Sequence, residues 1–284
     1  MAPLNRSAPT ELYDAYIFDM DGTIYLGDEF LPGAFRLVTE LRRRDIPVRF
    51  LSNNPTKDPA QYAEKLDRLG LPTPVAEIAN TVVVMTRWLL DHHPNKVVYP
   101  IAEQPLIDAL TEAGITISED PAEIDVVIAS YDRTFTYEKL QIAFDAIWFH
   151  QRAILVTTNP DRYCPFPGGR GEPDAAAIVA AIEACTGTTL TKNVGKPDPD
   201  MLTAALSGLD VDPAHCVMVG DRLGTDIQMA LDIPMPSALV LTGDSTEAEA
   251  QALPVEQRPT FVLDRVDHLL PDVTRAELGW RDDD

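Results

Sequence analysis

Short apolar runs alternate with amphipathic segments along this chain. The runs at residues 16–18 and 47–51 have the length of buried strands, whereas apolar residues at 31–44 and 59–69 recur at the spacing of one helix face. Strands that alternate with helices in this order form a parallel sheet with helices on its faces. The beginning of the sequence therefore predicts an α/β fold.

The same alternation continues through the middle and the last third of the chain. In the middle we predict helix 81–93, strand 97–99, helix 103–113, strand 125–129, helix 136–149, strand 153–157 and helix 174–185. In the last third we predict helix 199–206, strand 216–219, helix 226–231 and strands 238–241 and 260–263. The last third thus returns to the first pattern, and the middle has enough elements to form an α/β domain of its own.

The composition is sufficient for a full hydrophobic core, and the net charge limits the classes of molecule that the chain is expected to bind. The chain has 284 residues, of which 45% are hydrophobic, and its formal charge is −22. This charge disfavours nucleic acids and anionic membranes as partners, and an anionic substrate would need local positive charge. No apolar run is long enough to span a bilayer, and residues 1–10 lack the layout of a secretory signal, so we expect a cytoplasmic protein.

Two carboxylates lie two positions apart where the first strand ends. Asp19 and Asp21 are followed by Gly22 and Thr23. Strand alternation directs both carboxylates to one side, at the carboxyl edge of the sheet, where α/β proteins bind ligands. Such a pair repels itself unless a cation neutralises it, which indicates a Mg²⁺ site with an aspartate nucleophile. The same residues are also typical of a surface turn, because Asp-Gly is a common turn dipeptide.

Three further polar loops each have a functional and a purely structural interpretation. Ser52-Asn53-Asn54 offers a hydroxyl, amides and backbone N–H groups to a phosphate oxygen, but such clusters also cap helices. Gly195-Lys196-Pro197 contains one of the few lysines, which also fits a surface residue before a turn. Gly220-Asp221, followed by Asp226, repeats the pattern of a strand that ends in a carboxylate, and an N-capped helix would show the same pattern.

The joint occurrence of the four loops is more informative than any one of them. The carboxyl ends of parallel strands meet at one edge of a sheet, so all four loops can converge there. Chemistry on a phosphate ester needs a nucleophile, a proton donor for the leaving oxygen, positive charge on the equatorial oxygens and a divalent cation. The four loops supply each of these groups once.

With these residues in this order, the chain resembles the haloacid dehalogenase (HAD) superfamily. Asp19-x-Asp21-Gly22-Thr23 is similar to its first motif, Ser52 to its second, Lys196 to its third, and Gly220-Asp221 through Asp226 to its fourth. The long insertion between the second and third motifs resembles a cap of the C2 type. Segments 52–54, 158–161 and 194–197 are similar to the NagD-like branch (subfamily IIA). Within that branch, segments 132–134, 136–139 and 173–178 are most similar to the arabinose-operon-type sugar phosphatases.

The resemblance, which covers about residues 14–245, implies a fold and a division of the chain. The fold class is α/β, with a Rossmann-like doubly wound parallel sheet as the core and a second, inserted α/β cap domain of the C2 type. Residues 1–93 and 191–284 are expected to form the core domain with the catalytic loops. Residues 94–190 are expected to form the cap, which sets substrate specificity.

The resemblance also implies roles for the catalytic residues. Asp19 is expected to attack phosphorus and form an aspartyl-phosphate, while Asp21 protonates the leaving oxygen and later takes a proton from water. Mg²⁺ is expected to be held by Asp19, the backbone carbonyl of Asp21, and Asp221. Asp226 is expected to support this site from outside the ligand set, and Lys196 to offset the charge of Asp19 and the phosphate.

Ser52 is expected to bind a phosphate oxygen as the fourth catalytic residue. The remaining residues expected to contact substrate are Gly22, Thr23, Asn53, Asn54, Thr158, Asn159 and Asp161. For the last three, which belong to the cap, a turn on its exterior is an alternative interpretation.

The predicted activity is Mg²⁺-dependent hydrolysis of small phosphomonoesters, with sugar phosphates as the favoured substrates. Two alternatives stay open: a phosphotransferase or mutase on the same fold, and an inactive protein that binds a phosphorylated ligand. Sugar mutases of this superfamily place their cap directly after the first motif, where this chain has little room. The expected partner is a small phosphorylated metabolite, with no nucleic acid and no membrane. A homodimer is an open option, because related proteins often dimerise through the cap.

Overall fold

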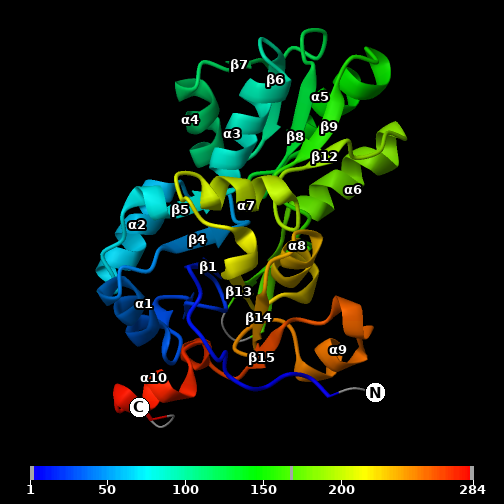
Figure 1. Ribbon diagram of the computed structural model, residues 1–284. Coiled ribbons are helices and arrows are strands. Elements are labelled where there is room, and N and C mark those ends of the chain that lie inside the picture. The colour runs from blue at the N-terminus through cyan, green and yellow to red at the C-terminus, as the bar shows by residue number, and fades with distance from the viewer. Residues whose placement is uncertain (1–2, 167–168, 282–284) are drawn as a thin grey trace. The chain divides into compact units, whose positions relative to one another are not determined.

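The chain folds into two compact units, seen in a computed structural model that describes residues 3–166 and 169–281. Unit 1 comprises the chain up to Leu51, Ala63–Ile78 and the chain from Leu202 onward, and unit 2 comprises Ser52–Tyr62 and Ala79–Met201. Each unit has its own parallel sheet with helices packed on it (Figure 1). The predicted α/β fold class is thereby confirmed, whereas a cap bounded near residues 94 and 190 stays a prediction.

The sheet of unit 1 is built outward from its first strand. Its strands, in spatial order, are β15 (Phe261–Leu263), β14 (Ser237–Val240), β13 (Cys216–Gly220), β1 (Ala15–Asp19), β4 (Val48–Ser52) and β5 (Ile78–Asn80). β1 pairs in parallel with both β4 and β13, and all five of its residues are buried, as expected for a strand covered on both faces. The chain runs from β1 to β4 and β5, and then restarts at β13 on the other side of β1. The topological switch point of the sheet therefore lies between β1 and β13.

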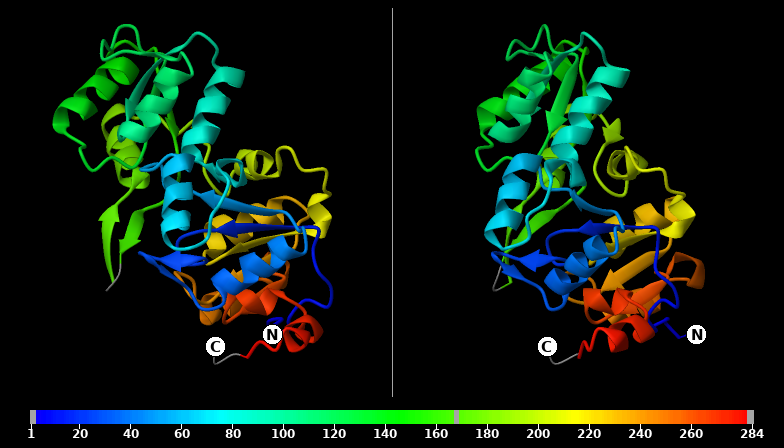
Figure 2. Two further views of the ribbon diagram at one scale, coloured as in Figure 1. Left: turned by 90° about the vertical axis from the view of Figure 1, so that its left-hand side faces the viewer. Right: turned by 60° about the vertical axis from the view of Figure 1, so that its left-hand side comes forward.

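The sheet of unit 2 is also parallel. Its strands, in spatial order, are β12 (Lys192–Asn193), β9 (Ile154–Thr157), β8 (Val126–Ala129), β6 (Val97–Ile101) and β7 (Thr116–Ile117). Alternate residues of β8, Val127 and Ala129, pack with Ala143, Ile178 and Ile182 from two helices on one face of the sheet. Two other helices cover the opposite face, as the views agree (Figures 1 and 2).

The helices match most of the predicted segments. The α-helices are α1 (Ala34–Arg43), α2 (Pro59–Arg68), α3 (Thr81–His92), α4 (Gln104–Glu112), α5 (Tyr137–Phe144), α6 (Ala175–Thr186), α7 (Pro199–Leu206), α8 (Gln228–Asp232), α9 (Glu247–Ala252) and α10 (Asp272–Glu277). Short 3₁₀ and π segments are η1 (Val75–Glu77), η2 (Asp145–Phe149), η3 (Pro213–His215), η4 (Leu223–Ile227), η5 (Val255–Gln257) and η6 (Val266–Leu269). In unit 2, α3 and α4 cover one face of the sheet, and α5 and α6 cover the other. Among the described residues, no helix has both the length and the apolar character needed to cross a bilayer.

Local chemistry moves several helix boundaries from their predicted positions. The helix predicted from residue 31 begins at Ala34, because Gly33 adopts a left-handed conformation with φ of 83°. The helix predicted at 136–149 begins at Tyr137, since the Thr136 hydroxyl accepts a hydrogen bond from the Lys139 amide as an N-cap, and it continues as a π-helix from Asp145.

Two antiparallel hairpins are not indicated by the sequence pattern. One joins β2 (Tyr25–Leu26) to β3 (Glu29–Phe30), and the other joins β10 (Tyr163–Phe166) to β11 (Arg170–Pro173). The glycine-rich sequence of 168–171 predicts a mobile loop, which is wrong for Arg170 and Gly171, while Gly168 lies outside the described residues. A Cβ on Gly171 would lie 3.0 Å from Cδ2 of Tyr163, so the glycine permits the close approach of the two strands.

Glu40 of α1 contributes stability that depends on pH. Its carboxylate accepts hydrogen bonds from Arg43 (Nε to Oε2, 2.7 Å) and from Arg44 (Nε to Oε1, 2.6 Å), and hydrogen bonding by Arg43 is the main cause that lowers the pKa of Glu40 from 4.5 to about 2. Because the pKa is lower in the folded state, this stability is present above pH 4.5 and disappears as the pH falls toward 2.

We therefore expect Glu40→Gln to lower the free energy of unfolding by about 1–2 kcal/mol at neutral pH, since water screens the exposed Arg43 partner. The difference from the unmodified protein should vanish as the pH approaches 2, as measured by urea unfolding across that range. Glu112→Gln, which neutralises an exposed carboxylate at the end of α4, is the control. A difference that stays constant down to pH 2 would contradict the proposed origin of the stability.

Candidate functional site

Three buried carboxylates meet at the carboxyl edge of the unit 1 sheet. Asp19 is the last residue of β1, Asp221 follows the last residue of β13, and Asp226 lies in η4. One oxygen from each carboxylate lies within 4.8 Å of those from the other two. The exposed fractions of the three residues are 8%, 4% and 0%. The cluster therefore lies at the switch point between β1 and β13, where α/β sheets bind ligands.

Three glycines leave room for the carboxylate side chains of this cluster, because a Cβ at any of them would overlap a carboxylate. A Cβ on Gly22 would lie 2.5 Å from Oδ2 of Asp221, and one on Gly243 would overlap the same carboxylate. A Cβ on Gly220 would likewise overlap the Asp226 side chain. Gly22 also has φ of 85°, a value that side-chain-bearing residues rarely adopt. The glycine next to Asp21 is thus required by the packing of Asp221 as well as by the turn.

Backbone amides orient the carboxylates. The Asp244 amide donates to Oδ2 of Asp221 at 2.8 Å, and the Arg222 amide donates to Oδ2 of Asp226 at 3.2 Å. Sequence reasoning missed both the segment 242–244 and its role. The Gly220-Asp221 motif indicated the strand end, but no signal in the sequence indicated that a loop after β14 would return to the same carboxylate.

The first loop is a closed turn that exposes Asp21. The Gly22 amide donates to the Tyr25 carbonyl at 2.9 Å, and the Tyr25 amide donates to the Met20 carbonyl at 3.2 Å. Asp21 is exposed, in contrast to Asp19. Thr23 is fully buried, and its hydroxyl has no hydrogen-bond partner among residues 3–166 and 169–281, so it is available to a water or a ligand.

The donor set of the cluster fits a hard divalent cation. Carboxylate oxygens are the ligands that Mg²⁺ and Ca²⁺ prefer, and three of them converge here from separate segments. Buried carboxylates in such proximity repel one another, and a bound cation would offset that repulsion. These side chains therefore have the chemistry of a cation site.

In unit 2, the amide of Asn53 connects three segments that sequence analysis selected separately. Its Oδ1 accepts from the Lys196 amide at 2.8 Å, and its Nδ2 donates to Oδ2 of Asp161 at 3.1 Å. The Asn159 side chain donates to the Asn53 carbonyl at 3.2 Å. Gly195 is needed here as well, because a Cβ would lie 2.9 Å from Cα of Asn159. Asn53, Asn159 and Lys196 are all buried.

Ser52 and Asn54 are held by a residue that the sequence did not single out. The Ser52 hydroxyl lies 3.2 Å from the Tyr62 hydroxyl and accepts from the Asn54 amide at 3.1 Å. The Tyr62 hydroxyl also lies 3.2 Å from the Asn54 carbonyl, to which it can donate. Thr158 is fully buried and donates to Ser130 at 2.9 Å, so its hydroxyl serves the interior of unit 2.

Comparisons with known proteins agree on one family. Residues 16–116 match a family described as haloacid dehalogenase-like hydrolase, and residues 193–269 match one described as HAD-hydrolase-like. The chain is 33% identical over 250 residues to an acid sugar phosphatase of Staphylococcus epidermidis, covering 88% of this chain and 93% of that protein. It is 34% identical over 240 residues to an acid sugar phosphatase of Staphylococcus aureus, covering 84% and 90% respectively.

Solved structures give the same result. A 4-nitrophenylphosphatase from Thermotoga maritima matches with a TM-score of 0.83 and 30% identity, covering 90% of this chain and 96% of that one. NagD from Escherichia coli matches with a TM-score of 0.79 and 27% identity, covering 90% of this chain and 98% of that one. The similarity thus extends over both units.

Proposed function

The chain belongs to the haloacid dehalogenase-like hydrolases, among their NagD-like phosphatases, and from this premise we propose that it hydrolyses small phosphomonoesters, with sugar phosphates as the preferred class. The observation that carries the proposal is the cluster of Asp19, Asp221 and Asp226 at the switch point of the unit 1 sheet. The substrate class follows from the relatives named acid sugar phosphatase, whose length the chain covers almost fully.

In the proposed first step, Asp19 attacks the phosphorus atom of the ester. A bond forms between its carboxylate oxygen and phosphorus, and the bond from phosphorus to the alcohol oxygen breaks. Asp21 gives its proton to that departing oxygen.

In the proposed second step, the Asp21 carboxylate takes a proton from a water molecule. The oxygen of that water attacks phosphorus, the bond to Asp19 breaks, and inorganic phosphate leaves. Asp19 returns to its carboxylate form, and Asp21 is again protonated, so the residues are ready for another substrate molecule.

We propose that Mg²⁺ is the cation of the site, held by the carboxylates of Asp19 and Asp221 and by the backbone carbonyl of Asp21. The three converging carboxylates support this assignment. When bound, the cation would offset negative charge on the phosphate and its nucleophile. Asp226 is fully buried near Asp221. It would not bind the cation itself and would keep the ligand carboxylates in position.

The phosphate itself is proposed to be recognised by Ser52, the Asn53 backbone and Lys196. Two facts support this. Ser52 directly follows Leu51, whose register partner in β1 is Asp19, and Lys196 is tied to Asn53 within unit 2. Further residues proposed to contact substrate or to support its loops are Gly22, Thr23, Asn54, Thr158, Asn159 and Asp161.

Asn53→Ala should lower kcat by roughly tenfold to a hundredfold. The truncation removes the acceptor of the Lys196 amide and the donor to Asp161, so Lys196 loses its fixed position. Steady-state phosphate release measures the effect, and Gln141→Ala, which removes an exposed amide from α5, is the control. Unchanged kinetics of Asn53→Ala would show that this amide does not position Lys196 for the reaction.

A panel of phosphate esters tests the proposed function. Hexose and pentose phosphates, glycerol phosphate, pyridoxal phosphate, nucleoside monophosphates and p-nitrophenyl phosphate would be incubated with the full chain, with and without Mg²⁺. Release of inorganic phosphate that needs Mg²⁺ and is fastest for sugar phosphates is expected. Absence of release from every ester would refute hydrolysis. Phosphate found on an added acceptor sugar would identify a transferase instead.

A further inference from the structure

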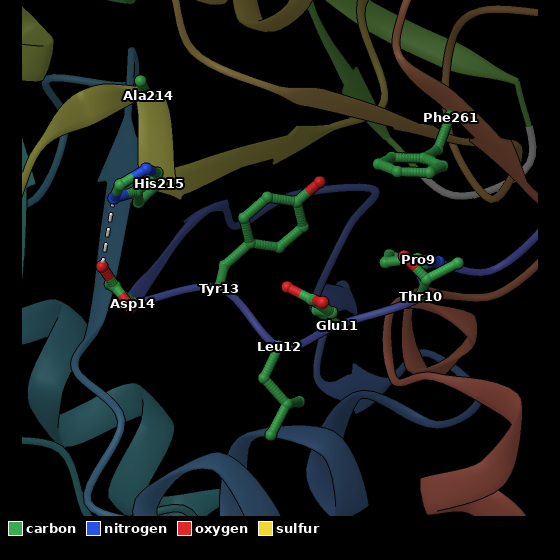
Figure 3. A pocket seen from close by; sticks show the side chains of 9 residues that line it. All are labelled: Pro9, Thr10, Glu11, Leu12, Tyr13, Asp14, Ala214, His215 and Phe261. Atoms are coloured by element: carbon green, nitrogen blue, oxygen red, sulfur yellow. Dashed lines mark ion pairs between the residues drawn. The ribbon is translucent and has the colours of Figure 1, made fainter.

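A hollow lies in unit 1, separate from the carboxylate cluster. Its volume is about 410 Å³, which falls within the range of small-molecule sites. The segment 9–14 forms one wall, with His215 at one end and Phe261 at the other (Figure 3). The hollow is therefore large enough for an organic molecule.

The strand directions place this hollow at the opposite edge of the sheet from the candidate catalytic residues. Asp14 directly precedes β1, His215 directly precedes β13, and Phe261 begins β15. The strands are parallel, so their amino ends share one edge, while Asp19 and Asp221 lie at the carboxyl ends. β1 has five residues, which separates the two edges by about 16 Å. The hollow is thus not a part of the proposed active site.

The lining of the hollow combines negative charge with aromatic surface. Glu11 and Asp14 supply exposed carboxylates, Tyr13 supplies a half-buried ring, and the largely buried ring of Phe261 closes one end. Asp14 already has a partner, because its Oδ2 lies 3.6 Å from Nδ1 of His215. Glu11 makes no hydrogen bond or ion pair within the described part of the chain. No lysine or arginine is among the lining residues, so two carboxylates would repel an anionic ligand and no permanent cation would attract it.

The same lining is unsuited to a bare metal ion. Within the described ranges, the single group of acidic, histidine or cysteine side chains close enough to share a metal is the Asp19, Asp221 and Asp226 cluster. Glu11 and Asp14 therefore lack a third ligand. Rings of tyrosine and phenylalanine instead suit a larger cation, whose charge is attracted to a carboxylate and to aromatic faces while its apolar stem covers the rings.

We propose that this hollow binds a small organic cation, an alkylammonium or alkylguanidinium, with its charged head at Glu11 and its stem against Tyr13 and Phe261. The net charge of −22 adds to the local attraction by raising the concentration of cations around the protein.

Isothermal titration calorimetry of the full chain with agmatine tests the proposal. Agmatine carries a guanidinium and an ammonium group on a short alkyl stem. Ionic strength would be held constant, since a strongly acidic protein attracts any cation weakly. One saturable site is expected. Glu11→Gln should raise its dissociation constant roughly threefold to fivefold, because Glu11 is exposed and water screens its charge.

Two variants separate specific binding from diffuse attraction. Glu277→Gln neutralises an exposed carboxylate of α10 that does not line the hollow, and should leave the titration unchanged. Phe261→Leu keeps an apolar residue in β15 and should weaken the binding of agmatine, because it removes a ring from the end of the hollow. Absence of saturable heat, or equal effects of Glu11→Gln and Glu277→Gln, would overturn the proposal.

Discussion

Replacing Asp19 with asparagine is expected to abolish phosphate release from p-nitrophenyl phosphate, with a loss of roughly 10⁴-fold or more. An amide of the same shape has no carboxylate oxygen to attack phosphorus, so no covalent intermediate can form. The substitution also removes one of the three charges in the buried cluster. Because Asn fits the same space, the fold should persist, and circular dichroism would verify it.

The matched control for Asp19→Asn is Asp28→Asn. Asp28 lies in the turn between β2 and β3, a few residues further along, and is more exposed than Asp19. The two variants carry the same change in net charge, so a loss confined to Asp19→Asn would come from the chemistry of that position. If Asp19→Asn keeps a near-normal rate, Asp19 is not the nucleophile.

Asp221→Asn should have opposite effects on activity and on the stability of the cation-free protein. Activity should fall at least roughly 10- to 100-fold, the loss typical of residues that only support a metal ligand. Stability without cation should rise, because one of three mutually repelling buried carboxylates becomes neutral. The asparagine oxygen can still accept from the Asp244 amide, so the local loop is retained.

Thermal unfolding with and without Mg²⁺ measures this pair of effects. In the unmodified protein, Mg²⁺ should raise the unfolding temperature, since it binds only the folded state. In Asp221→Asn that increase should be small or absent. The unfolding temperature of this variant without Mg²⁺ should be higher than that of the unmodified protein without Mg²⁺. Asp232→Asn, a substitution at the end of α8 and outside the carboxylate cluster, should behave like the unmodified protein. Full Mg²⁺ stabilisation of Asp221→Asn would rule out Asp221 as a ligand.

The strand ends of the candidate site could be predicted because their signals are local. An apolar run that stops at a carboxylate, with a glycine at most three residues away, marks both Asp19 and Asp221 in the sequence alone. The contacts between distant segments could not be predicted. Two examples are the hydrogen bond from the Asp244 amide to Asp221 and the contact between Tyr62 and Ser52. Both depend on the paths of loops, and no spacing of residues in the sequence indicates either of them.

The pattern of apolar residues did not predict those strands and helices whose sequences lack the usual periodic spacing. β10 and β11 contain prolines and a glycine, which normally argue against a strand, yet an isolated two-stranded hairpin tolerates them. The short helices α9 and α10 have too few residues to show an amphipathic period. The helix predicted at 226–231 begins instead as the π-segment η4, because Asp226 turns inward to the cluster.

The pairing of β1 with β13 has a consequence for the order in which the chain acquires its structure on the ribosome. Ala15 pairs with Cys216, so the centre of the unit 1 sheet stays incomplete until most of the chain has been synthesised. Unit 2 is drawn almost entirely from the stretch in between and can fold as that stretch emerges. The carboxylates of Asp19 and Asp221 therefore cannot come together before the whole of unit 2 has been synthesised, so their mutual repulsion arises late and does not oppose the folding of unit 2.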